Sequence, residues 1–223
     1  MLPLRDDIPH SQTPIICYFL IATNMAMFLF MVTLSDRALS GFLASFAVTP
    51  AADVPLALRR QWDGILPFVT NMFLHGGWLH LGGNLLFLHI FGDNVEDRMG
   101  HARFLIFYLL CGVTASVAHA WANPGSQLPS LGASGAIAGV LAAYMIYFPR
   151  ARILSLVVLG FLITTVRIPA FVYLILWFVM QAFSGLMSLG RETATGGVAW
   201  WAHIGGFIAG LVLVFPFSRP TRE

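Results

Sequence analysis

Ser134 is the residue of this chain best placed to act as a nucleophile. It stands among glycine and alanine in the stretch 131–139, at the start of an uncharged run that continues to residue 148. A serine hydroxyl in an apolar helix commonly bonds the carbonyl one turn back or joins two helices. Three other polar residues inside apolar runs, His80, Asn84 and His203, open a second interpretation. A serine within hydrogen-bond reach of a histidine supplies the nucleophile and general base of acyl transfer.

His80 and Asn84 are four residues apart, so they share one face of a helix. Polar groups at membrane depth usually face the bundle interior or a water-filled cavity. An imidazole and an amide there can stabilise a developing oxyanion, or they can join neighbouring helices. This pair alone leaves both interpretations open. His75 lies at the entrance of the same run, and we expect it to bond to the preceding loop.

Two patterns of small residues favour a meeting of Ser134 with His203. A Gly-x-x-x-Gly pattern begins at Gly135, and a second begins at Gly206. Such faces let two helix backbones approach closely. If these two faces meet, the serine and the histidine come within hydrogen-bond reach. Plain packing without chemistry is the alternative interpretation of both patterns.

The chain offers no carboxylate for a catalytic triad, because no Asp or Glu lies between Asp97 and Glu192. A Ser-His-Asp triad uses a carboxylate to hold the imidazole. We therefore predict a dyad of Ser134 and His203, with the histidine held by packing or by other hydrogen bonds. The chain also lacks a His-Glu-x-x-His pattern, and zinc needs three or four converging ligands. Neither a metal nor another cofactor is expected.

The composition indicates that these residues lie in a membrane protein. Of 223 residues, 58% are hydrophobic and only 10% are charged, whereas soluble domains carry about 25% charged residues. Every cation is arginine, the formal charge is +2, and no basic cluster suits nucleic acid. Cys17 and Cys111 stand in apolar runs without metal-ligand spacing, so we interpret both as small buried hydrophobic residues.

Six apolar runs predict an all-α bundle of six transmembrane helices, with a short fourth helix that carries the serine. The runs are 15–34, about 78–92, 104–121, 131–148, 170–189 and 198–217. We expect one membrane-embedded domain over 15–217, a cytoplasmic N-terminal segment over 1–14 and a cytoplasmic tail over 218–223. The long first loop, about 36–66, mixes charged with aromatic residues and predicts a folded loop at the interface.

The stretch 153–166 is apolar but only 14 residues long. As a helix it would cover about 21 Å at 1.5 Å per residue, and the hydrocarbon core is about 30 Å thick. We expect an interfacial or re-entrant segment and do not count it as a span. With six spans, Ser134 and His203 enter the membrane from the same side and lie at similar depth.

The arginines predict the orientation of the six spans. The positive-inside rule places the side with more arginines in the cytoplasm, and both termini with it. The arginines on that side are Arg5, Arg98, Arg103, Arg150, Arg152, Arg167, Arg219 and Arg222, and those opposite are Arg37, Arg59, Arg60 and Arg191.

Three separated segments resemble the motifs of the rhomboid intramembrane serine proteases. They are His75-Gly76-Gly77-Trp78-Leu79-His80-Leu81-Gly82-Gly83-Asn84, Gly132-Ala133-Ser134-Gly135 and Ala202-His203-Ile204-Gly205-Gly206. The stretch 96–100 resembles the turn that follows the second span in this family. The order and spacing of these segments match from about residue 67 to residue 217.

The resemblance implies a function and a role for each residue. Ser134 would be the nucleophile and His203 its general base, while His80, Asn84 and the Ser134 backbone N–H would form the oxyanion hole. The supporting residues would be His75, Gly132, Gly135 and Gly206. The substrate would be a transmembrane segment of another membrane protein that unwinds readily, with a small residue before the cut. The resemblance implies no cofactor, and we expect a multi-pass protein of the bacterial cytoplasmic membrane.

One departure from the family concerns the histidine. Some relatives place an aromatic residue one turn after the serine, against the histidine ring, and here Ala138 occupies that position. Two other functions compete with proteolysis. A catalytically silent rhomboid-like protein would bind membrane helices without cutting them, but both Ser134 and His203 are present. A small transporter or channel would spread ionisable groups through the whole membrane depth, whereas here they cluster at one end of the spans.

Overall fold

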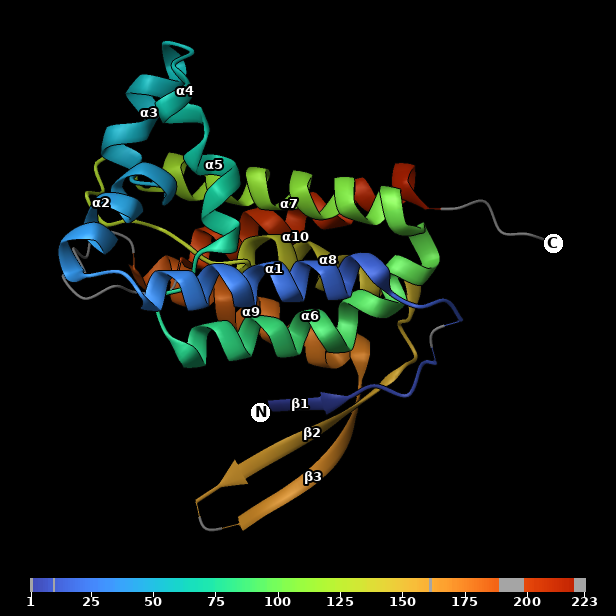
Figure 1. Ribbon diagram of the computed structural model, residues 1–223. Helices are drawn as coiled ribbons and strands as arrows, with labels where there is room; N and C mark the ends of the chain where they lie inside the picture. Colours follow the sequence, from blue (N-terminus) through green and yellow to red (C-terminus); the bar gives the residue numbers. More distant parts are fainter. Residues whose placement is uncertain (1, 10, 161, 189–198, 219–223) are drawn as a thin grey trace.

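The computed structural model describes residues 2–9, 11–160, 162–188 and 199–218. Six helices form a bundle, in which they run side by side along a common direction (Figure 1). The expected tail 218–223 lies outside the described residues except for Ser218. The helices are α1 (Ile15–Val32), α6 (Trp78–Met99), α7 (His101–Ala122), α8 (Ser134–Tyr147), α9 (Ala170–Ser188) and α10 (Trp200–Phe217).

Helix α8 lies at the centre of this bundle and contacts α6, α7, α9 and α10. It is built from small and aliphatic residues, and every residue from Gly135 to Met145 is buried. Its 14 residues span about 21 Å, which fits a helix enclosed by longer neighbours. Three helices, α1, α7 and α10, are long and apolar enough to cross a membrane. The structure therefore agrees with a helical membrane bundle, and the count of six spans remains a prediction.

The long first loop is folded, and it covers one end of the bundle (Figure 1). An isolated bridge between Val48 and Ser130 ties it to the connection before α8. The loop contains α2 (Asp36–Phe46), α3 (Pro50–Leu58) and α4 (Trp62–Ile65), and α5 (Pro67–Thr70) and the short 3-10 helix η1 (Asn71–Phe73) lead from it to α6.

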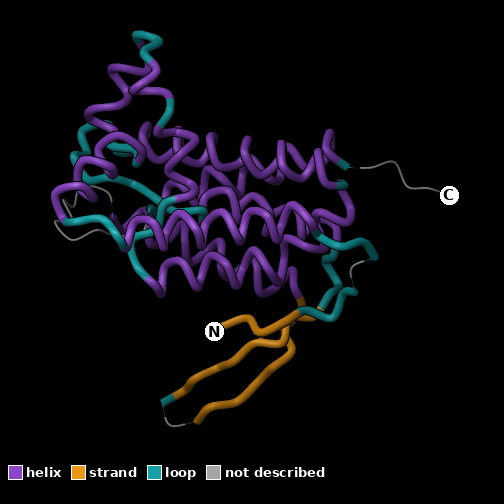
Figure 2. Tube along the Cα trace, in the orientation of Figure 1, coloured by secondary structure: helices purple, strands orange, loops and turns teal. Residues whose placement is uncertain are grey.

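A three-stranded antiparallel sheet corrects the all-α prediction (Figure 2). Its strands are β1 (Leu2–Arg5), β2 (Arg152–Leu159) and β3 (Leu162–Pro169), with β2 in the middle. The stretch 153–166, whose length we assessed above as that of a helix, is a β-hairpin. In it, Val158 pairs with Ile163 and Ser155 pairs with Val166. Valine, isoleucine and threonine are enriched in strands. Gly160, in the turn, takes a φ of 60° that other residues rarely adopt.

The N-terminal segment closes the end of the bundle opposite the first loop. We call residues 2–9 and Ser11 the N-terminal latch. Asp6 Oδ2 accepts hydrogen bonds from Tyr144 at 2.5 Å and from Asn94 at 2.8 Å. Asp7 accepts the backbone N–H of Arg152 at 2.8 Å. The latch thus joins the ends of α6 and α8 to the sheet.

Glu96 secures the start of α1 at the same end of the bundle. Its carboxylate, 1% exposed, accepts the backbone N–H groups of Ile16 at 2.9 Å and Cys17 at 2.7 Å. These N–H groups belong to the first turn of α1 and have no partner inside the helix. A carboxylate there also interacts favourably with the helix dipole. His101 reaches the same carboxylate at 2.5 Å.

Candidate active site

Ser134 is the first residue of α8, and the backbone before it turns at Gly132. Gly132 has a φ of 133°, which L-residues with a side chain rarely adopt. A Cβ atom at this position would lie 2.7 Å from His80 Nε2. The Gly132 N–H donates to the carbonyl of Asn71 at 2.9 Å, which anchors the turn. Both conformation and space therefore require glycine beside Ser134.

Ser134 and His203 are joined by a hydrogen bond of 2.7 Å between Oγ and Nε2. The histidine ring is 7% exposed, on the first turns of α10. The two glycine faces meet, as predicted, because a Cβ atom at Gly206 would collide with the carbonyl oxygen of Gly135. At Gly210 it would lie 2.6 Å from the Cα atom of Gly139. The close approach of α8 and α10 thus carries the serine to the histidine.

Gln181 is the site residue that sequence reasoning missed. Its Oε1 atom lies 2.5 Å from His203 Nδ1, and the glutamine is 7% exposed. The available signal was an amide inside the apolar run 170–189, because polar groups at membrane depth are costly. Aromatic contacts to the His203 ring come from Trp177 and Trp200, at centroid distances of 5.8 and 6.3 Å. Two tryptophans thus contact the ring although Ala138 replaces the aromatic residue of other relatives.

His80 and Asn84 occupy neighbouring turns of α6. The contact of His80 with Gly132 places its imidazole against the chain just before Ser134. Asn84 is 7% exposed. Its Nδ2 group has no hydrogen-bond partner among the described residues. An amide donor left free by the fold is available to a substrate oxygen.

His75 is buried, and its ring lies 5.2 Å from the His80 ring. Neither ring nitrogen finds a hydrogen-bond partner in the part of the chain that the structure describes, so the expected bond to the first loop is not observed. Burial, with a smaller contribution from nearby His80, lowers the pKa of His75 to about 4. The ring is therefore neutral at physiological pH and packs against His80.

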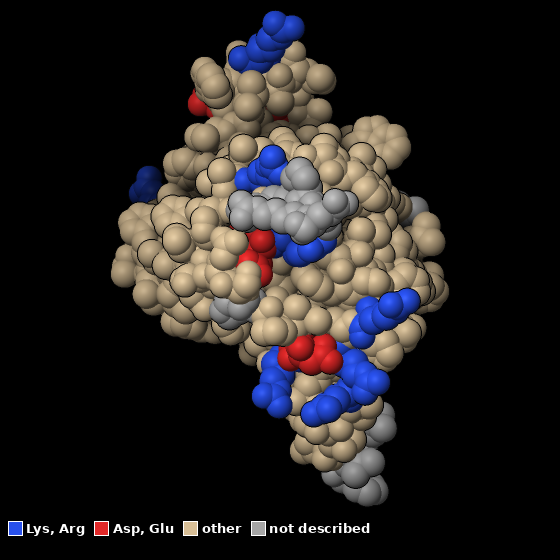
Figure 3. Space-filling model, turned by 90° about the vertical axis from the view of Figure 1, so that its right-hand side faces the viewer, with Lys and Arg blue, Asp and Glu red and all other residues tan. Residues whose placement is uncertain are grey.

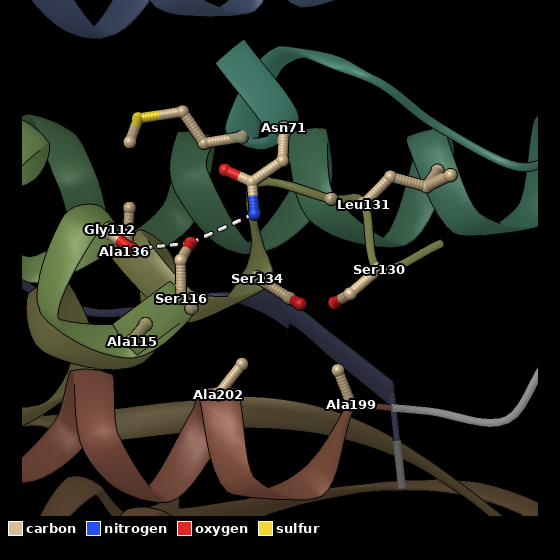
Figure 4. Close-up of a pocket in the computed structure, with 13 residues that line it drawn as sticks. Asn71, Gly112, Ala115, Ser116, Ser130, Leu131, Ser134, Ala136, Ala199 and Ala202 are labelled. Atoms are coloured by element: carbon tan, nitrogen blue, oxygen red, sulfur yellow. Dashed lines mark hydrogen bonds between the residues drawn. The ribbon is translucent and has the colours of Figure 1, made fainter. Parts of the chain in front are cut away.

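A small cavity opens beside Ser134 (Figure 4). Its volume of about 10 Å³ is close to the space that one water molecule needs, roughly 10–15 Å³. Asn71 donates to the Ser116 hydroxyl at 2.8 Å on one wall. Asn71 Oδ1 has no hydrogen-bond partner among the described residues. The opposite wall is formed by Ala202 of α10 and by Ala199, which precedes that helix, so only a small group fits.

No group of three His, Cys, Asp or Glu side chains in the described ranges is arranged to hold a metal ion. Cys17 and Cys111 are both buried, as predicted, and both are free thiols. The polar groups around Ser134 are thus an imidazole base, an amide that holds it and further hydrogen-bond donors. This set of groups can carry out acyl transfer on a carbonyl.

Comparison with known proteins agrees with this arrangement. The rhomboid domain profile matches residues 61–220. Rhomboid-like protein 11, chloroplastic, from Arabidopsis thaliana is 35% identical over 74% of this chain. Rhomboid protein 1, mitochondrial, from Saccharomyces cerevisiae is 29% identical over 71%, and Rhomboid protease GluP from Bacillus subtilis is 30% identical over 93%. The matches cover 56%, 43% and 36% of these relatives, so the chain spans about half or less of each.

Proposed function

This chain belongs to the rhomboid family, and we propose that it is an intramembrane serine endopeptidase. The observation that carries the proposal is the 2.7 Å hydrogen bond between Ser134 Oγ and His203 Nε2. In this proposal, His203 takes the proton of Ser134 while Oγ attacks the scissile carbonyl. The same imidazole then gives its proton to the leaving amine. A water molecule, deprotonated by His203, hydrolyses the acyl-enzyme and restores the serine.

The oxyanion of each tetrahedral intermediate would be held by groups around the start of α8. The Ser134 backbone N–H lies in the first turn of the helix, where N–H groups have no intrahelical partner. The helix dipole favours negative charge at the same place. His80 and Asn84 would add side-chain donors, and a donor of this kind is typically worth about 10²–10³ in rate.

The proposed substrates are transmembrane segments of other membrane proteins. A stable helix hides its carbonyl groups, so a segment must unwind locally before attack. The small cavity beside Ser134 supports a small side chain next to the cut. The proposed topology has six spans with both termini in the cytoplasm. Among the three relatives above, the Bacillus subtilis protein matches the largest share of the chain. This coverage supports a bacterial cytoplasmic membrane.

Fluorophosphonate labelling tests the activated serine directly. The detergent-solubilised protein should be labelled, Ser134→Ala should abolish the signal, and His203→Ala should reduce it to a slow residual rate. Ser45→Ala is the matched control, because this exposed serine of the first loop does not line the cavity, and it should keep the labelling. Equal labelling of the parent and Ser134→Ala, or none in a folded parent, would contradict the proposal. The catalytically silent, helix-binding alternative would then lead.

A further inference from the structure

We propose that Gln181 is a positioning residue that holds His203 in the one tautomer able to activate Ser134. This inference rests on the proposed function, because it assigns a partner to the proposed general base. Gln181 Oε1 is only an acceptor, so at 2.5 Å from His203 Nδ1 it requires a proton on that nitrogen. Nε2 is then unprotonated and accepts the Ser134 hydroxyl at 2.7 Å.

The other tautomer would block the reaction. With the proton on Nε2, the imidazole would donate to Ser134, and its lone pair would lie on Nδ1, on the side of the ring away from the serine. A buried amide oxygen that accepts from Nδ1 disfavours this tautomer, because the oxygen would then lose its donor. Gln181 thus takes over the orienting role that a carboxylate has in a triad. It does so without placing a charge at membrane depth, where a carboxylate is costly.

The rest of α9 supports the same contact. Trp177 lies four residues before Gln181, so both side chains project from one face of the helix. The Trp177 ring is tilted by 36° against the His203 ring, and Phe178 stacks on Phe207 of α10 at 4.5 Å. The face of α9 that packs on α10 therefore presents one amide, and this amide meets the imidazole.

A double-mutant cycle separates positioning from a merely structural role. Gln181→Leu should lower the fluorophosphonate labelling rate of Ser134 about tenfold or more, within the range of measured coupling energies. In a His203→Ala background, the same substitution should leave the residual labelling rate unchanged. Gln181→Glu should restore part of the loss, because a carboxylate oxygen also accepts from Nδ1. Met180→Leu, at an exposed neighbouring position, is the control and should label like the parent.

A spectroscopic measurement keeps this proposal separate from the protease proposal. Nitrogen NMR of histidine-labelled protein, with His203→Ala to assign the signal, should show a protonated Nδ1 in the parent and a mixture of tautomers in Gln181→Leu. Equal losses of labelling in both backgrounds, or an unchanged tautomer, would overturn the role of Gln181. An unlabelled parent with the expected tautomer change would overturn the protease proposal and leave the positioning role intact.

A different observation concerns the sheet, and from it we infer that its outer face contacts anionic lipid headgroups. The opposite face of the sheet packs on the bundle at the base of the hairpin, which is the end far from its turn. There Ile153 and Ser155 are fully buried. The strand register defines the outer face, which comprises Arg152, Leu154, Leu156, Val158, Ile163, Thr165 and Arg167. This inference requires a position beside the bilayer but no catalytic activity.

Charge and hydrophobicity separate along this outer face. Arg152 and Arg167 lie at its base, where positively charged atoms gather around the junction with the bundle and only a small acidic patch interrupts them (Figure 3). Val158 and Ile163 lie toward the tip and are 59% and 67% exposed. The hairpin leaves the bundle obliquely, and its tip points back alongside the helices (Figure 1). Arginine at headgroup level with apolar residues beyond it is typical of interfacial membrane binding.

The unpaired edge of β3 limits the depth of this contact. β3 pairs only with β2 among the described strands, so its outer backbone groups need water or headgroups as partners. The sheet should therefore lie at the headgroup boundary and not in the hydrocarbon core. Thr164 and Thr165, both exposed on β3, suit the same level.

An environment-sensitive fluorophore on Ile163→Cys tests the contact, because Cys17 and Cys111 are buried. Its emission should shift to the blue in vesicles that contain phosphatidylglycerol, and less in phosphatidylcholine alone. Joint Arg152→Gln and Arg167→Gln substitutions should remove the difference, whereas Arg59→Gln with Arg60→Gln on the first loop should keep it. Equal shifts in both lipids, or emission like that of a label at Gln61→Cys, would overturn the inference.

Discussion

Both ends of the bundle contain buried polar groups, but the two ends treat these groups differently. At the end of the bundle that carries the latch, the carboxylates of Asp6 and Glu96 accept hydrogen bonds of 2.5 to 2.9 Å from described neighbours. Around Ser134, buried polar atoms of Asn71, His75 and Asn84 find no partner within the described residues. Partnerless buried atoms also occur elsewhere, as in Tyr108.

In the proposed function, this difference separates groups that hold the fold from groups that would bind substrate. A buried polar group without a partner costs about 1–3 kcal/mol, and native proteins leave few of them. Several such atoms beside a serine that already has its base are best explained by a substrate that would pair with them. The hydrogen bonds of the Asp6 and Glu96 carboxylates are made within the described residues, so their loss should affect stability and not chemistry. The predictions below test this separation.

Asn84→Ala should produce the largest effect, on activity alone. Loss of one oxyanion donor lowers rates by about 10²–10³. The free energy of unfolding should change little, because the removed Nδ2 group makes no hydrogen bond among the described residues. Cleavage of a transmembrane substrate in vesicles and unfolding in mixed micelles measure the two quantities. Asn24→Ala, another buried asparagine, is the control and should leave cleavage intact. A large loss of unfolding free energy in Asn84→Ala would show that this residue holds the fold and would contradict the separation.

Glu96→Gln should show the opposite behaviour. It weakens charge-assisted bonds to the first turn of α1 and to His101, at a cost of about 2 kcal/mol in unfolding free energy. Fluorophosphonate labelling per folded molecule should stay within about twofold of the parent, because Glu96 bonds to the start of α1 and to His101 and not to the residues around Ser134. Labelling that falls while the free energy of unfolding is unchanged would show that Glu96 serves the chemistry.

Gly210→Ala should affect both properties, because the glycine contact between α8 and α10 connects the two regions. The new methyl group meets the backbone of Gly139, and such overpacking costs about 1–3 kcal/mol. Labelling should fall as well, because the separated helices draw His203 away from Ser134. Gly82→Ala has open space around the new methyl group and should be neutral or slightly stabilising. If Gly210→Ala kept the labelling and the unfolding free energy of the parent, α8 and α10 would not pack closely at Gly139 and Gly210.

Asp6→Asn should have the smallest effect, visible only as a pH dependence. Burial raises the pKa of Asp6, although the Tyr144 hydroxyl opposes part of this rise. The folded state thus favours the protonated acid. Its stabilising contribution is complete at a pH below 3.8, the pKa of Asp6 in the unfolded chain. The contribution declines as the pH rises from there through the higher pKa of the folded state. The asparagine variant should lack this decline when unfolding is measured across that window. Parallel pH profiles would contradict the assignment.

The sequence predicted the helices and the serine–histidine pair because local patterns encode both. Apolar runs mark helices at membrane depth, and the glycine spacing after Ser134 and His203 marks the faces that meet. Gln181 was missed because its partner His203 lies 22 residues away on another helix. No local sequence pattern links a single amide to a particular distant histidine. The hairpin was missed because a short apolar run does not distinguish a strand from a buried helix.

The pairing of β1 with β2 gives the chain an order of assembly. Leu2 pairs with Leu156, so β1 must wait for its partner until the chain as far as β2 has been made. Contacts between such distant segments form late, because a long loop has to close first. Strand β1 is therefore made well before its partner strand and docks late. A substitution in β1 that weakens this pairing would be felt at this late step, after the helices between the two strands have formed.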